Sequence, residues 1–86
     1  FALTQNEPNP WREQTKVSYS LPAPGVARFT FFDVTGRLIM EKNLPSVEGP
    51  NVFTISRSDM KGITGMIVYK RECEGQTSQR KMLLFD

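Results

Sequence analysis

The sequence predicts an all-β domain, a sandwich or barrel of antiparallel strands, on three observations. Apolar and polar residues alternate along several stretches, as they do in strands with one buried face. Turn-forming residues separate these stretches at intervals of about 10 residues. No segment carries an apolar stripe with a helical period of about 3.6 residues over three turns. The 86 residues are enough for one domain with a small core.

A single domain is expected over residues 1–86, with a proline- and asparagine-rich N-terminal arm at residues 1–14 and the sandwich at 15–86. Within the arm, prolines and asparagines alternate up to Trp11, the only tryptophan. Each proline fixes its own φ and disfavours helix at the residue before it, and asparagine side chains close local turns. The arm is therefore predicted to be neither helix nor central strand. The alternative is a proline-rich linker that abuts the domain.

Two strands with aromatic residues follow the arm, separated by the turn signals of residues 22–25. Their predicted inward-facing residues are Val17, Tyr19, Leu21, Ala27, Phe29 and Phe31. Phe32 falls on the opposite face, so its ring is expected to point away from the main core. A hairpin connection from Asp33 to Gly36 comes next, because Gly36 suits a positive φ.

Four more strands are predicted at residues 37–44, 52–57, 66–72 and 77–85. Residues 45–50, with two prolines and a glycine, are expected to form a loop. Phe53 and Ile55 are predicted to face inward, and Ser58 to cap one short helical turn. A short pairing of residues 1–5 would add a seventh strand.

Composition narrows the classes of function. The 11 basic and 9 acidic residues are too balanced for the concentrated basic patch of a nucleic-acid-binding protein. No apolar run approaches the roughly 20 residues of a transmembrane helix. The absence of histidine excludes Ser-His-Asp and Cys-His mechanisms. Carboxylate pairs remain, but most carboxylates lie at turns or alternate with apolar residues, so we expect no catalysis. We also expect no cofactor.

Three local features have both a structural and a functional interpretation. Asp33, with Gly36 and Arg37, suits either an anion or metal site or simply a braced hairpin turn, and the hairpin is favoured. The basic pairs at 70–71 and 80–81 face each other across a turn. They predict either one recognition patch or ordinary charges that protect a sheet edge. Cys73, the only cysteine, is expected to be a passive thiol.

Four motifs follow one another along the chain. They are Gln5-Asn6-x-Pro8-Asn9-Pro10-Trp11, Thr15-x-Val17-x-Tyr19-x-Leu21-Pro22, Asp33-x-x-Gly36-Arg37 and Lys81-Met82-Leu83-Leu84. Their order and spacing resemble the type A C-terminal sorting domain of the type IX secretion system of Bacteroidetes. The resemblance covers nearly the whole chain and implies an immunoglobulin-like antiparallel β-sandwich of about seven strands. The span from Met60 to Ile67 departs from the family, because it is longer and Ile67 stands where tyrosine is usual.

The resemblance implies a secretion signal rather than an enzyme. The outer-membrane translocon would recognise the domain and carry an upstream cargo domain across the outer membrane. A sortase-like protease would then cleave the signal, leaving the cargo secreted or on the cell surface. Because the chain begins with Phe1, we expect a piece of a longer precursor. The recognition residues that the resemblance implies are Gln5, Asn6, Pro8, Asn9, Pro10, Trp11, Gly36, Arg37, Lys81, Met82, Leu83 and Leu84.

Two other functions stay open. An immunoglobulin-like or fibronectin-like accessory module would bind carbohydrate or protein, and it would present an exposed aromatic platform. Trp11, Phe32 and Tyr69 are the candidates for that platform, but we expect them to pack within the domain. A purely structural spacer would require a position in the middle of a longer chain.

Overall fold

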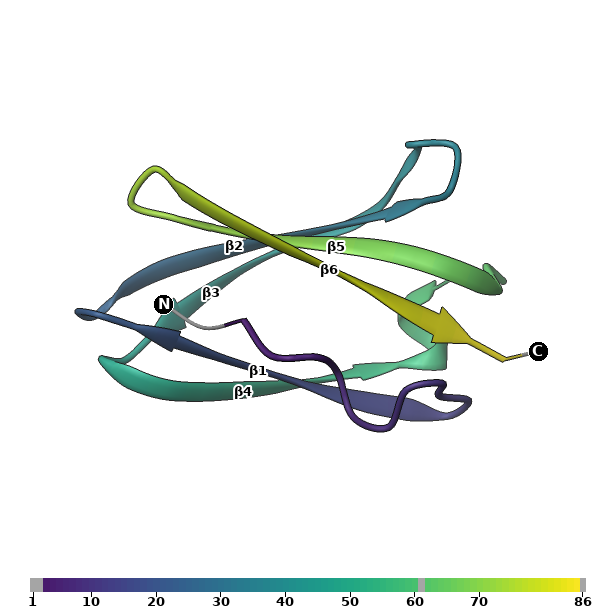
Figure 1. The fold of residues 1–86 in the computed structure, drawn as a ribbon, viewed down its shortest axis with the longest axis horizontal. Helices are drawn as coiled ribbons and strands as arrows, with labels where there is room; N and C mark the ends of the chain where they lie inside the picture. The colour runs from purple at the N-terminus through teal and green to yellow at the C-terminus, as the bar shows by residue number, and fades with distance from the viewer. Residues whose placement is uncertain (1–2, 61, 86) are drawn as a thin grey trace.

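The computed structural model describes residues 3–60 and 62–85, and over these the fold is an all-β antiparallel sandwich, as predicted (Figure 1). The elements are β1 (Gln14–Leu21), β2 (Gly25–Asp33), β3 (Leu38–Ser46), β4 (Gly49–Ser56), the 3-10 helix η1 (Arg57–Met60), β5 (Gly65–Cys73) and β6 (Gln76–Leu84). Strands β1 and β4 form a small sheet. The large sheet has the order β3-β2-β5-β6.

The N-terminal arm closes one side of the sandwich. It pairs with β1 through antiparallel bridges from Leu3 to Tyr19 and from Glu7 to Lys16. It then reaches the other sheet, where Trp11 pairs with Leu84 of β6 in parallel orientation. Figure 1 shows the arm running beside β1 and ending near the arrowhead of β6. The Leu3 bridge supplies part of the predicted seventh strand, while residues 1–2 lie outside the described residues.

The core lies between the two sheets and contains the inward-facing residues predicted from the alternation. All six residues predicted for the first two strands are buried. Rings of Tyr19, Phe29 and Phe53 meet edge to face, with centroids 4.7–6.2 Å apart. Phe31 stacks on Tyr69 at 5.9 Å. Each such aromatic pair adds about 0.5–1.5 kcal/mol beyond the burial of its area.

The predicted loop at residues 45–50 is wrong, because β3 and β4 continue through it to leave only residues 47–48 between them. Pro45 pairs with β2 and Pro50 with β1. Proline is tolerated in both strands because each lies at the edge of its sheet. The side chain of Asn51 closes the short connection, accepting from the Val47 amide at 3.1 Å and donating to the Val47 carbonyl at 3.0 Å.

The predicted helical turn is present, but Ser58 does not begin it. The helix η1 starts at Arg57, so Ser58 lies inside it. The carboxylate of Asp59 instead reaches back to accept a hydrogen bond from the Ser56 amide at 2.9 Å. This is the acidic half of a capping box, in which a side chain near the start of a helix satisfies an amide that precedes it.

Candidate recognition surface

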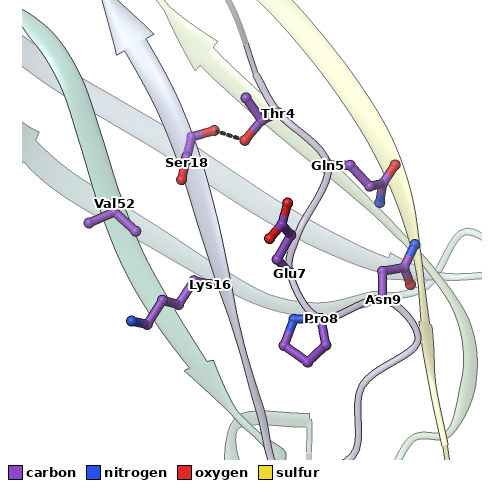
Figure 2. A pocket seen from close by; sticks show the side chains of 8 residues that line it. All are labelled: Thr4, Gln5, Glu7, Pro8, Asn9, Lys16, Ser18 and Val52. Carbon is purple, nitrogen blue, oxygen red and sulfur yellow. Dashed lines mark hydrogen bonds between the residues drawn. The ribbon is translucent and has the colours of Figure 1, made fainter.

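The arm and β6, the two segments that the resemblance marks for recognition, are joined directly by hydrogen bonds. Gln5 Nε2 donates to the Lys81 carbonyl at 2.6 Å, and the Leu83 amide donates to Asn9 Oδ1 at 2.9 Å. Figure 2 shows the side chains of Gln5 and Asn9 on the side of the arm that faces β6. The arm and β6 therefore form one continuous surface, the arm–β6 junction, although 70 or more residues separate them in the chain.

Trp11 anchors this junction. Its amide donates to the Leu83 carbonyl at 3.0 Å, and its carbonyl accepts from the Phe85 amide at 2.8 Å. Its indole is only 1% exposed, and Nε1 donates to Met82 Sδ at 3.2 Å. The indole N–H is thus satisfied inside the core, as a buried tryptophan requires. Trp11 holds the end of the arm against β6 through both its backbone and its ring.

Asn6 fixes the first half of the arm through a buried polar network. Its side-chain amide donates to the Pro8 carbonyl and to Thr15 Oγ1, both at 3.1 Å. Its backbone N–H donates to the Tyr69 hydroxyl at 3.1 Å, and that hydroxyl donates to the Thr4 carbonyl at 3.0 Å. The bond to Pro8 is the local turn that asparagine was predicted to close. An apolar side chain in place of Asn6 would remove both bonds and leave Pro8 and Thr15 joined only by the bond from the Thr15 hydroxyl to the Pro8 carbonyl at 2.9 Å.

Sequence reasoning missed Tyr69 as the tyrosine of this corner. The resemblance placed the family tyrosine at Ile67, two residues earlier. Both residues face the core, because side chains two apart on a strand share one face. Burial raises the pKa of the Tyr69 hydroxyl above its ordinary value of 10.0, while the hydrogen bond with Asn6 and the charge of Arg80 oppose the shift. The shared face was the signal that could have identified Tyr69.

The implied recognition residues divide into buried and accessible groups. The buried ones are Asn6, Trp11, Met82 and Leu84. Seven are exposed and Leu83 is half-buried; the exposed residues are Gln5, Pro8, Asn9, Pro10, Gly36, Arg37 and Lys81. The buried group shapes the junction and cannot touch a partner in the folded domain. Only the accessible group offers direct contacts.

Gly36 and Arg37 lie in the hairpin between β2 and β3, and their hydrogen bonds stay within it. Asp33 Oδ1 accepts from the amides of Thr35 and Arg37 and from the Thr35 hydroxyl at 2.6–3.1 Å. The Thr35 hydroxyl contributes most to holding the Asp33 pKa below its ordinary value, with the two amides and the nearby Arg37 charge adding to this effect. Gly36 has a φ of 90°, which suits glycine. The braced-hairpin interpretation therefore accounts for this motif locally.

Of the two interpretations of the basic pairs, a single patch of all four residues is excluded, because the pleat of the sheet divides them between its two faces. Arg71 is 2% exposed and donates to the Ser20 carbonyl and to Ser78 Oγ. Arg80 pairs with Tyr69 in the strand register, so it shares the face of that buried ring. Lys70 and Lys81 lie on the outer face instead. Adjacent residues on a strand point to opposite faces.

Two of the three candidate platform aromatics are packed inside, as expected. Trp11 and Tyr69 are buried, while Phe32 is half-buried on the outer face of the large sheet. The Lys70 ammonium lies 5.4 Å from the centroid of the Phe32 ring. These three residues therefore form no shared exposed platform for a sugar ring.

An open groove of about 900 Å³ is lined by residues of the arm, of β1 beside it and of β4 (Figure 2). It is lined by Thr4, Gln5, Glu7, Pro8, Asn9, Lys16, Ser18 and Val52. Its charged lining residues are one carboxylate, Glu7, and one ammonium, Lys16. Across residues 3–60 and 62–85, no cluster of three or more His, Cys, Asp or Glu side chains could hold a metal ion.

A comparison with family models, curated proteins and solved structures finds no match to this chain. Among the residues that the structure describes, no helix is long and apolar enough to cross a membrane.

Replacing Tyr69 with phenylalanine is expected to destabilise the domain by about 1–3 kcal/mol, because a buried amide and a partly buried carbonyl of the arm lose their partner. Urea unfolding measures this loss. The raised pKa also predicts that wild-type stability falls as pH rises above 10, because the unfolded state releases the Tyr69 proton first. The phenylalanine variant has no hydroxyl at this position, so its stability should decrease less than that of the wild type above pH 10. Equal stability of both proteins at pH 7 would contradict the role assigned to Tyr69.

Proposed function

We propose that this domain is a C-terminal sorting signal, recognised by the outer-membrane translocon of the type IX system. One observation carries the proposal. The two segments that the resemblance marks for recognition, far apart in sequence, meet at the arm–β6 junction. A partner that binds this junction would contact the N-terminal arm and the C-terminal strand β6 at once. It would thereby distinguish the folded signal from an unfolded chain.

Lys81 is the recognition residue best placed for direct contact. Its side chain is exposed, while its carbonyl accepts the hydrogen bond from Gln5. The ammonium is thus free to meet a partner at a position that the backbone fixes. Pro8 and Pro10 are also exposed, and their rings stiffen the arm beside it.

In this proposal the domain acts together with other proteins rather than as a catalyst. Its partners are the translocon, a sortase-like protease that removes the signal, and a cargo domain in the same precursor. The cargo would pass through the periplasm and end outside the cell or on its surface. The proposal includes no nucleic acid and no cofactor.

The alternative is an accessory module that binds carbohydrate or protein, and the groove between the arm and the small sheet is the observation that favours it. Burial of Trp11 and Tyr69 counts against sugar binding, because these rings cannot form a platform. The two functions predict different results in an export experiment.

Fusing this domain to the C-terminus of a foreign periplasmic protein should carry that protein across the outer membrane in a host with the type IX system. Lys81→Ala should reduce export strongly without changing the melting curve, since replacing a surface lysine costs little stability. Lys16→Ala, an exposed lysine on the small sheet, is the matched control and should export normally. The quantity measured for each variant is the fraction of the cargo protein found in the medium.

The result that would overturn the sorting function is retention of the wild-type fusion in the periplasm while a known sorting domain exports the same cargo. The accessory-module alternative would then be preferred. Equal export by the Lys81 and Lys16 variants would instead keep the sorting function and remove Lys81 from its recognition residues.

A further inference from the structure

The outer face of the large sheet, at the end where β2 meets the hairpin, gathers apolar side chains that the sandwich does not cover. Strand register places Leu38, Phe32 and Val68 side by side, and Met66 beside Leu83. Directly paired residues share a face, so these five residues form one surface, the outer apolar face. Leu38 is 52% exposed and Met66 41% exposed. Single exposed apolar residues are ordinary, but a contiguous group marks an interaction site.

This face contains a hollow of about 290 Å³. It is lined by Phe32, Asp33, Val34, Gly36, Val68 and Lys70. Figure 1 shows the β2–β3 hairpin extending beyond the large sheet at this end. Gly36, which the resemblance implied for recognition, thus belongs to the wall of a hollow lined by both apolar and charged residues. A glycine here also adds no side chain that would narrow the space.

Two lysines lie beside the hollow. Lys70 lies over the Phe32 ring, and Lys81 pairs with Val68 in the register. Glu72 lies two residues from Lys70 on the same face of β5 and pairs with Arg28 in the register. Two further carboxylates on this side are also engaged. Asp33 is held by the hairpin amides and lies 3.4 Å from Arg37, and Glu41 lies 3.5 Å from Arg28. The lysines therefore give this face a local positive charge.

Charge and shape together select one kind of partner. A second copy of this chain would bring Lys70 and Lys81 against a surface that carries the same lysines, which costs free energy. A bilayer surface presents no protruding group that would fill a hollow. A protein segment with an apolar side chain between carboxylates satisfies both the shape and the charge.

We propose that the outer apolar face docks an acidic protein segment, whose protruding apolar side chain enters the hollow while its carboxylates pair with Lys70 and Lys81. This inference rests on the proposed sorting function, and it specifies the chemistry of the partner that recognises the domain. It also joins the hairpin motif and Lys81 in one contact, which the arm–β6 junction alone does not do.

A binding experiment on the 86-residue chain tests this directly. The probe is a blocked pentapeptide with a central phenylalanine and two glutamates on each side, titrated against ¹⁵N-labelled protein. Amide shifts should centre on Phe32, Val68, Lys70 and Lys81, and binding should weaken with added salt. Lys70→Glu should weaken binding at least about tenfold, which corresponds to about 1.4 kcal/mol. Lys16→Glu, the same charge change on the other sheet, should leave binding unchanged.

Four results would overturn the inference. They are absence of peptide binding, shifts centred on the groove beneath the arm, equal losses from the Lys70 and Lys16 variants, and binding of a control peptide with lysines in place of glutamates. If the domain instead sediments with phosphatidylglycerol vesicles and the peptide does not displace it, the face binds a membrane. If the amide shifts of this face change with protein concentration in the absence of peptide, the face binds a second copy of the chain.

Export of the Lys70→Glu fusion separates this inference from the proposed function. If the wild-type and Lys70→Glu fusions are exported equally, the docking face is wrong while the sorting function stands. If the wild-type fusion itself is retained, the sorting function is wrong, and the peptide titration still decides what the face binds.

Discussion

Replacing Phe31 with alanine is expected to lower the free energy of unfolding by about 3–5 kcal/mol. Its ring is fully buried between the sheets and stacks on Tyr69. Truncation removes apolar contacts and leaves a cavity that strands on both sides prevent from collapsing. Since small domains have only about 5–15 kcal/mol of stability in all, this single change should approach the limit of folding. Urea unfolding monitored by circular dichroism measures the loss.

Phe32→Ala provides the matched control, because it removes the same ring from the next position on the opposite face. Phe32 is only half-buried, so its replacement should cost less than half as much. A loss below about 1 kcal/mol for Phe31→Ala would place that ring outside the core. A larger loss for Phe32 than for Phe31 would mean that the strand register is shifted by one residue.

Replacing Trp11 with alanine should also cost about 3–5 kcal/mol, the range for deleting a buried tryptophan. Its ring is 1% exposed and holds the arm against Met82. The substitution should also weaken the protection of backbone amides at the arm–β6 junction. The amide of Phe85, which donates to the Trp11 carbonyl, should exchange faster with solvent as the junction loosens. Denaturant unfolding and native-state hydrogen exchange measure the two effects.

Trp11→Phe separates the ring's apolar contribution from its N–H. It keeps most of the buried surface and loses the contact between Nε1 and Met82, so its loss should be the smaller of the two. Unchanged exchange at Phe85 in Trp11→Ala would show that the backbone bonds alone maintain the junction, contrary to the anchoring role assigned to the ring.

Much of the fold was predictable because strand alternation is a local property. The inward-facing positions of β1 and β2 follow directly from the two-residue period, although Thr30, on the opposite face of β2, is buried as well. The loop predicted at residues 45–50 is absent because proline does not interrupt a strand at the edge of a sheet. Proline lacks a donor, but this matters only where a neighbouring strand would accept the bond. Pro45 and Pro50 lie in edge strands, and edge positions cannot be identified from the sequence without knowing the order of the strands.

The contact between the arm and β6 could not be predicted from the sequence. The resemblance predicts both segments as recognition elements, which stays a prediction, whereas the hydrogen bonds between them depend on long-range packing. Local charge reasoning placed Arg71 in a surface patch, whereas the sheet turns it inward to the Ser20 carbonyl and Ser78. Its buried position follows from facing the same way as Ile67 and Tyr69. The face of β5 on which Arg71 lies determines its burial, although its side chain is charged.

The junction between the arm and β6 also sets a delay during synthesis. The partners of Leu3, Gln5, Asn9 and Trp11 lie 71–77 residues later in the chain. At about 5–20 residues per second, the ribosome needs on the order of 4–15 s to make that interval. Throughout it, the indole of Trp11 has no Met82 to cover it. The nascent arm therefore presents an apolar ring directly after two stiff prolines to any chaperone at the tunnel exit, and pairing with the last strand ends that exposure.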